Sequence, residues 1–357
     1  MNISQNKKNT DLQEKCVYYF FKSKSCNNEK IKPIHKIRNK DFFLMNELTN
    51  SKKIHTIQDY KYYYYVYETT SELKITELDA DVDCVSSGEY IKSDGTVLLK
   101  FDNRELIYFK NYLKALSSST KYIFTIIDFY KRLLKSVGLL VNKQIVHNYI
   151  NFDTVVIDKR SEVPLLSEFS LSIDLSNKNI EQYLKSFFIE YDPSYLEWPL
   201  EIHILSYLIT NKLTDQQNSL SSYNIETIIC NVLEHNNILK TFGDKVVSSY
   251  KQEALEYFKK YVNQTYDYIL TDILKHSNTW DNYSLSIMFL RILIGIHRSI
   301  KIQNKFIIMF MKLLVCNIHL NPLKRLSIGS TTNNFNSILD SLEPKDYKEV
   351  LDNLISA

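Results

Sequence analysis

The sequence predicts an α+β protein in which a small strand-rich part precedes a larger helical part. Aromatic and β-branched residues are frequent enough over 60–67 and 73–78 to predict strands, and the turn residues at 86–88 and 93–95 mark a further strand over 96–101. From residue 105 onward, apolar side chains recur instead at steps of three and four, as on the buried face of a helix. The change of period predicts a strand-rich region over 16–104 and a helical region over 105–340.

The two ends of the chain carry no such pattern. Residues 1–15 are polar and aperiodic, which predicts a disordered tail. We expect a short C-terminal helix or tail over 341–357.

Composition excludes several classes of function. The chain has 44 basic and 41 acidic side chains, and this near balance argues against a dedicated nucleic-acid binder. Its 5 cysteines lie far apart, without the spacing of a zinc or redox motif, so we expect a reduced, cytoplasmic protein. Charged residues interrupt the longest apolar stretches, so we expect no membrane span.

The middle of the chain carries the most informative motifs. A long helical pattern over 122–137 leads into a loop that opens with His147, followed by short strand patterns over 154–157 and 163–166. An acidic-Phe-small triplet, Glu168-Phe169-Ser170, comes next. This layout resembles the catalytic loop of protein kinases, H-R-D-x-K-x-x-N, followed by their D-F-G motif.

Three further motifs follow in the order that protein kinases have. Trp198-Pro199-Leu200-Glu201 resembles A-P-E, 281–286 resembles the D-x-W-S-L-G start of the central F helix, and 321–325 resembles D-P-x-x-R. The resemblance looks closest to divergent kinase-like proteins of large AT-rich DNA viruses. It implies a two-lobed fold, with an N-lobe over 16–104 and a helical C-lobe over 105–340, in host-cell cytoplasm or in a virion.

The segment between the first and second of these three motifs, from Glu201 to Asp281, is longer than in ordinary kinases. Helical patterns over 225–239 and 253–274 predict a helical insertion over about 205–278. Two interpretations stay open: the insertion binds a partner, or it only thickens the core.

The positions that carry kinase chemistry are degenerate. Tyr149 stands where the family has its catalytic Asp, and a phenol with a pKa of about 10 cannot replace that carboxylate at neutral pH. Asn151 replaces a catalytic-loop Lys, and Thr154 replaces a metal-binding Asn. Glu168 replaces the Asp of D-F-G and could form a residual cation site with Asp153, although a merely solvated carboxylate is the simpler interpretation.

The sequence also disfavours Mg²⁺-ATP binding, and we expect no cofactor. A kinase closes a Gly-rich turn over the phosphates, whereas the first of the 6 glycines here is Gly88. Candidates for the phosphate-pairing lysine are Lys32 and Lys36, and Glu47 is the candidate for its helical partner.

The residues that hold a kinase fold together are retained. The resemblance implies that Phe169 packs beside His147 and that Asp281 accepts hydrogen bonds from the catalytic-loop backbone. It also implies a buried ion pair between Glu201 and Arg325.

These features favour a pseudokinase, a catalytically inactive kinase-like protein that binds or scaffolds an unidentified protein partner. Two alternatives remain. One is an atypical active Ser/Thr protein kinase that uses Glu168, Asp153 and an unassigned lysine. The other is a helical adaptor unrelated to kinases.

Overall fold

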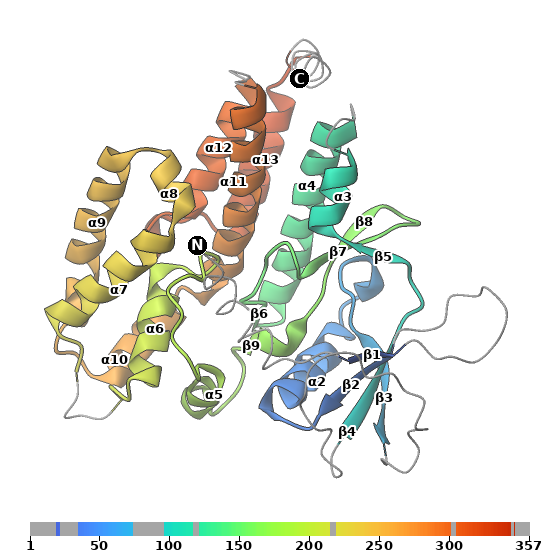
Figure 1. Cartoon of the computed structure of the whole chain (residues 1–357), viewed down its shortest axis with the longest axis horizontal. Helices are drawn as coiled ribbons and strands as arrows, with labels where there is room; N and C mark the ends of the chain where they lie inside the picture. Colours follow the sequence, from blue (N-terminus) through green and yellow to red (C-terminus); the bar gives the residue numbers. More distant parts are fainter. Residues whose placement is uncertain are drawn as a thin grey trace, which may run out of the picture.

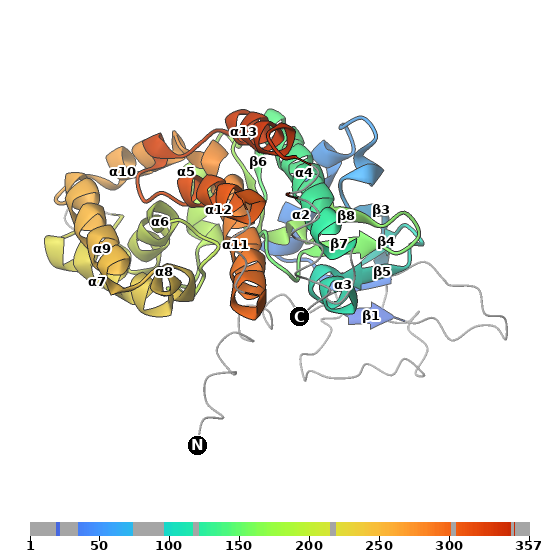
Figure 2. The ribbon, with the colours of Figure 1, turned by 90° about the horizontal axis from the view of Figure 1, so that it is seen from above.

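The structure is a computed structural model that describes residues 19–21, 35–73, 96–116, 121–214, 219–300, 305–343 and 346. It is α+β (Figure 1). A four-stranded sheet and its helix α2 lie at one side, and helices α6 to α10 lie at the other. Helices α4, α11, α12 and α13 stand between them, as the second view also shows (Figure 2). The predicted tail over 1–15 and nearly all of 344–357 lie outside the described residues.

The sheet is antiparallel, with strand order β1-β2-β4-β3. It has a small core of its own, and helix α2 contributes Leu44 to this core. Asp41 begins that helix, because its carboxylate accepts a hydrogen bond from the Leu44 backbone N–H at 2.6 Å. The elements of this part are β1 (Tyr19–Phe21), β2 (His35–Asn39), α2 (Phe42–Ile54), η1 (Tyr60–Tyr62), β3 (Tyr67–Leu73) and β4 (Thr96–Phe101).

Two small sheets follow and position the central loop. Strand β5 (Leu106–Tyr108) pairs with β7 (Val155–Asp158), which pairs with β8 (Val163–Leu166). Strand β6 (Ile145–Val146) pairs with β9 (Ile173–Asp174). All these pairings are antiparallel, and the buried helix α4 runs into β6.

The rest of the chain is helical, and its apolar faces share one large core with α4. The helices are α3 (Phe109–Leu116), α4 (Lys121–Asn142), η3 (Phe169–Leu171), α5 (Ile180–Phe187), α6 (Leu200–Thr210), α7 (Ser222–His235), α8 (Asn237–Thr241), α9 (Asp244–Phe258), η4 (Lys259–Tyr261), α10 (Tyr266–Leu274), η5 (Ser277–Thr279), α11 (Trp280–Ile300), α12 (Lys305–Asn317), η6 (Pro322–Lys324) and α13 (Ile328–Asp340). Within the described ranges, none of these helices combines the length and the apolar character that crossing a bilayer requires.

The tyrosine-rich run over 60–67 is not the strand that its composition predicts. It forms the short helix η1 and an irregular turn, and β3 starts only at Tyr67. Asp59 precedes η1 in the left-handed backbone region, with φ of 57°. Tyr64 is 1% exposed and donates its hydroxyl hydrogen to the Ser136 carbonyl at 2.6 Å. Aromatic residues suit a packed core as well as a strand, so composition alone could not separate the two.

Most of the predicted run over 73–78 lies outside the described residues, whereas 96–101 forms β4 as predicted. The helical pattern over 253–274 is interrupted, because α9 ends at Phe258 and α10 starts only at Tyr266. Thr265 starts the second helix by accepting a hydrogen bond from the Tyr268 backbone N–H.

Candidate functional site

The first turn of α11 holds the loop that follows β6. The Asp281 carboxylate accepts hydrogen bonds from the backbone N–H groups of His147 at 2.7 Å and Asn148 at 2.8 Å. Burial raises the pKa of Asp281 to about 7, and the two N–H donors only partly offset that effect. One carboxylate thus fixes the start of the loop to the buried helix.

His147 is a packed residue rather than an exposed acid or base. Its ring lies edge-on to Phe169, with ring centroids 4.8 Å apart, and its Nε2 lies 2.9 Å from the Ser167 carbonyl oxygen. Burial lowers the pKa of His147 to about 4, so the ring is neutral near pH 7. On the other side Phe169 contacts Tyr64, whose ring centroid is 5.8 Å away. The contact therefore joins this loop to the chain between α2 and β3.

The polar side chains of the loop are turned toward the loop's own backbone. Thr154 is 1% exposed, and its hydroxyl donates to the Tyr149 carbonyl at 2.8 Å and accepts from the Asn151 backbone N–H at 3.0 Å. The Asn151 side-chain oxygen accepts from the backbone N–H groups of Asp153 at 2.8 Å and Thr154 at 3.2 Å. This is an Asx-type turn, in which a side chain replaces a backbone acceptor. Both side-chain oxygens therefore already have hydrogen-bond partners within the loop.

Tyr149 lies in an aromatic group rather than beside a carboxylate. Its ring centroid is 5.4 Å from that of Tyr195, which stacks on Trp198 at 4.8 Å. Burial raises the pKa of Tyr149 above its ordinary value of 10, so the phenol is protonated at neutral pH. Trp198 donates its indole N–H to the Asn148 carbonyl at 2.7 Å. These contacts connect the loop to the segment before α6.

Glu168 and Asp153 carry the acidic groups of the candidate cation site. Glu168 adopts a left-handed backbone, with φ of 66°, and is half-buried, whereas Asp153 is exposed. Such a backbone is uncommon for a residue other than glycine. In the part of the chain that the structure describes, no three His, Cys, Asp or Glu side chains gather closely enough to hold a metal ion.

Glu47 has a basic partner that the sequence did not single out. Its carboxylate accepts a hydrogen bond from Arg38 Nη1 at 2.8 Å, and the two side chains are 5% and 3% exposed. Lys32 lies outside the described residues. Lys36 lies in β2, where its backbone is opposite Leu99 of β4, and its side chain is outside the described part.

Arg38 and Lys36 lie two residues apart in one basic stretch of the sequence, so the pattern alone did not separate them. The preference of arginine for buried ion pairs is the signal that could have selected Arg38.

Helix α2 also makes polar contacts with the segment that follows Phe169. The Asn46 amide donates to the carbonyls of Ser170 at 2.8 Å and Ser172 at 2.7 Å, and the Asn50 amide donates to Ser172 at 3.2 Å. Lys53 binds the Asp174 carboxylate at 2.5 Å. Asn46 and Asn50 are buried, so the inner face of the helix is polar and a search for apolar periodicity misses it.

Glu201 and Arg325 form a bidentate ion pair, with N–O distances of 2.5 and 2.9 Å. Their side chains are 1% and 0% exposed. The guanidinium also lies 5.1 Å from the Tyr283 ring centroid. Burial opposes the charge on Arg325, but the neighbouring carboxylate outweighs it and raises the pKa of the guanidinium. The pair fastens α6 to the turn before α13.

No protein-family model matches this chain, and no curated protein sequence matches it. Function must therefore be inferred from the geometry of the site.

Proposed function

We propose that the chain is a pseudokinase: a two-lobed, protein-kinase-like protein without catalytic activity that serves as a binding or scaffolding module. On this proposal the small sheet with α2 is the N-lobe, the helices form the C-lobe, and α7 to α10 are the insertion. The resemblance to kinase-like proteins of large AT-rich DNA viruses extends the proposal to infected-cell cytoplasm or a virion, and to a protein partner.

The observation that carries the proposal is the hydrogen bonding of Asn151 and Thr154. In an active kinase the residues at these two positions serve the transferred phosphate and a metal ion. Here both side chains bind the loop's own backbone instead, at 2.8–3.2 Å. A metal ion would have to compete with these hydrogen bonds, and Tyr149 supplies no carboxylate to orient a substrate hydroxyl.

The contacts that hold the loop in place support the kinase-like part of the proposal. Three contacts are those expected if the chain keeps a kinase framework. They are the packing of His147 against Phe169, the hydrogen bonds of Asp281 to the loop, and the ion pair of Glu201 with Arg325. Two of these contacts, Asp281 with the loop and Glu201 with Arg325, join segments more than 100 residues apart, so they are unlike the chance matches that short motifs give in a sequence. A kinase-like protein that has lost catalysis is expected to keep the contacts that hold its fold and to lose the side chains that bind metal and phosphate.

An atypical active kinase is the second candidate, and one observation favours it. Arg38 and Glu47 form a buried ion pair between a strand and the following helix. Active kinases use a Lys–Glu pair in this position to hold the nucleotide phosphates. In this chain Arg38 would take the place of that lysine, and Glu168 could then hold a metal ion.

Phosphoryl transfer separates the two candidates. Purified protein is incubated with radiolabelled Mg²⁺-ATP, alone and with a generic protein substrate, and its melting temperature is measured with and without the nucleotide. The pseudokinase proposal predicts no transfer of label and no change in melting temperature. Transfer that disappears in Glu168→Ala, but persists in the exposed control Glu256→Ala, would establish an active enzyme.

A further inference from the structure

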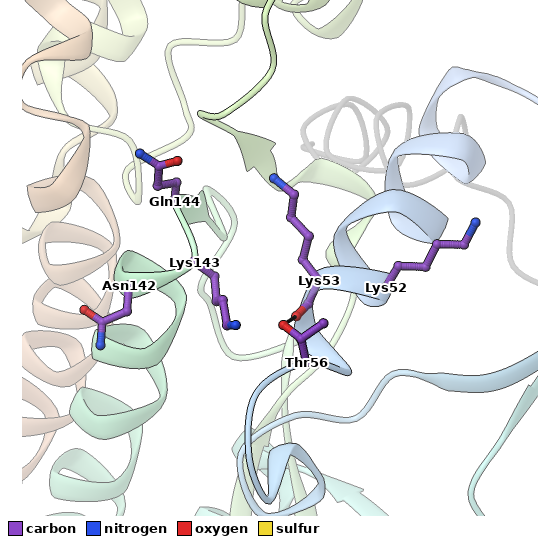
Figure 3. Close-up of a pocket in the computed structure, with 6 residues that line it drawn as sticks. All are labelled: Lys52, Lys53, Thr56, Asn142, Lys143 and Gln144. Atoms are coloured by element: carbon purple, nitrogen blue, oxygen red, sulfur yellow. Dashed lines mark hydrogen bonds between the residues drawn. The ribbon is translucent and has the colours of Figure 1, made fainter.

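A basic pocket lies between the end of α2 and the end of α4, and its lining does not include the loop that contains Tyr149 and Thr154. It has a volume of about 400 Å³. Two segments far apart in the sequence line it: the end of α2 with the turn that follows, and the junction of α4 with β6. Its lining residues are Lys52, Lys53, Thr56, Asn142, Lys143 and Gln144 (Figure 3).

Two of the three positive charges that line this pocket have no acidic partner among the described residues. The lining contains three lysines and no acidic side chain. Lys53 is neutralised by Asp174, at 2.5 Å. Lys52 and Lys143 form no ion pair with any described residue, so the pocket keeps a surplus of two positive charges. Lysines near the end of α2 also suit the helix dipole, but this effect does not involve Lys143, which comes from another element.

The pocket is built on a fixed frame. Lys53 is held by Asp174 and by the Ser176 hydroxyl, each at 2.5 Å. Gln144 has a left-handed backbone, with φ of 56°, and its carbonyl accepts a hydrogen bond from the Leu175 backbone N–H at 2.9 Å. Figure 3 shows Lys53 and Lys143 on the two sides of the gap between α2 and the end of α4, with Lys52 extending away from them. A ligand between the two elements would meet Lys143 directly and could draw Lys52 inward.

We propose that this pocket binds a phosphate monoester. A ligand with two negative charges matches the ammonium group of Lys143, which faces the gap, together with that of Lys52 once it is drawn inward. The phosphate could belong to a phosphorylated protein segment or to a free small molecule. None of the lining residues belongs to the proposed pseudo-active site, so this inference stands or falls independently of the pseudokinase proposal.

Calorimetric titration of the full chain tests the inference. The probes are a short phosphoserine peptide, the same peptide without phosphate, and glycerol 3-phosphate. We expect saturable binding of the two phosphorylated probes and none of the unphosphorylated peptide. Tighter binding of the peptide than of glycerol 3-phosphate would assign the phosphate to a protein, and equal binding would assign it to a free small molecule.

Variants and pH show whether the lysines carry the binding. Lys143→Ala and Lys52→Ala should each weaken binding roughly tenfold, as expected for the loss of a charge-assisted contact. Lys110→Ala removes an equal charge from an exposed position on α3 and should change nothing. Binding should also weaken below about pH 6, where a phosphate monoester loses its second charge.

Unchanged affinity in Lys143→Ala and in the charge-reversed Lys143→Glu would overturn the inference, and so would the absence of any phosphate-dependent binding. Neither lysine forms an ion pair or a side-chain hydrogen bond with a described residue, so these variants should fold normally, and an unchanged melting temperature verifies this.

Discussion

Replacing one partner of the Glu201–Arg325 pair should destabilise the protein severely. The guanidinium donates to both carboxylate oxygens, at 2.5 and 2.9 Å, and to the His319 carbonyl at 2.7 Å. Because both side chains are at most 1% exposed, removing Arg325 strands a desolvated carboxylate. Losses of this kind cost about 3–5 kcal/mol. We expect Arg325→Met and Glu201→Met each to lower the free energy of unfolding by that amount.

The double variant gives the sharper test. With both charges replaced by apolar side chains of similar size, no ion is left buried without a partner. We expect Glu201→Met/Arg325→Met to be about as stable as either single variant, so that the two changes are coupled by about 3–5 kcal/mol, the full cost of one single change. Urea denaturation followed by circular dichroism measures all four free energies.

An exposed pair on α4 provides the control. Arg132 and Asp128 lie 2.6 Å apart, one helical turn from each other, with about half of each side chain exposed. Their alanine variants should be coupled by less than about 0.5 kcal/mol. Additive effects at Glu201 and Arg325, no larger than those of this surface pair, would refute the interpretation of the buried pair as a framework contact.

Three further predictions follow from the loop and from α2. Thr154→Val keeps the side-chain shape but removes a buried donor to the Tyr149 carbonyl, and it should cost about 1–3 kcal/mol in urea denaturation; an unchanged free energy would show that this hydrogen bond contributes nothing. His147 has its pKa lowered from 6.5 to about 4, so the stability that its neutral ring contributes is present above pH 6.5 and is lost as the pH falls to about 4. The free-energy difference between wild type and His147→Gln should therefore shrink over that window, and a constant difference would contradict the assignment. Arg38→Met should cost about 3–5 kcal/mol, because it removes the buried guanidinium that pairs with the Glu47 carboxylate, and a loss below about 1 kcal/mol would place this pair with the exposed ones.

The sequence predicted the elements that leave a clear local pattern of apolar or turn residues. Turn residues before it marked the strand over 96–101, which forms β4, and helical periodicity marked the start of α4. The contacts of His147 with Phe169, of Asp281 with the loop, and of Glu201 with Arg325 came from the resemblance, because no local pattern brings distant residues together.

Polar packing explains what the sequence could not predict. Asn46 and Asn50 on the buried face of α2 act through carbonyls of a segment more than 120 residues away, and such pairing leaves no periodic signal. Arg38 stood among several basic residues, and only the fold shows which of them is buried. Likewise, the sequence indicated that Asn151 and Thr154 had lost a function, but not that both side chains hydrogen-bond to the loop itself.

On the pseudokinase proposal, these contacts would let the framework persist without nucleotide. Helix α2 is held against the segment after Phe169 by amide–carbonyl hydrogen bonds and by Lys53 with Asp174, all of which exist within the chain. On the pseudokinase proposal, the protein would keep one fixed arrangement whether or not ATP is present. A constant binding surface is what a scaffold requires.

Hydrogen–deuterium exchange of the amides over 147–154, with and without Mg²⁺-ATP, tests this claim most directly. The side chains of Asp281, Asn151 and Thr154 accept hydrogen bonds from backbone N–H groups of this loop. These amides should therefore exchange slowly in the free protein and at the same rate when nucleotide is added. Rapid exchange in the free protein that slows markedly with Mg²⁺-ATP would show that the loop becomes ordered only when nucleotide binds, and would contradict the account.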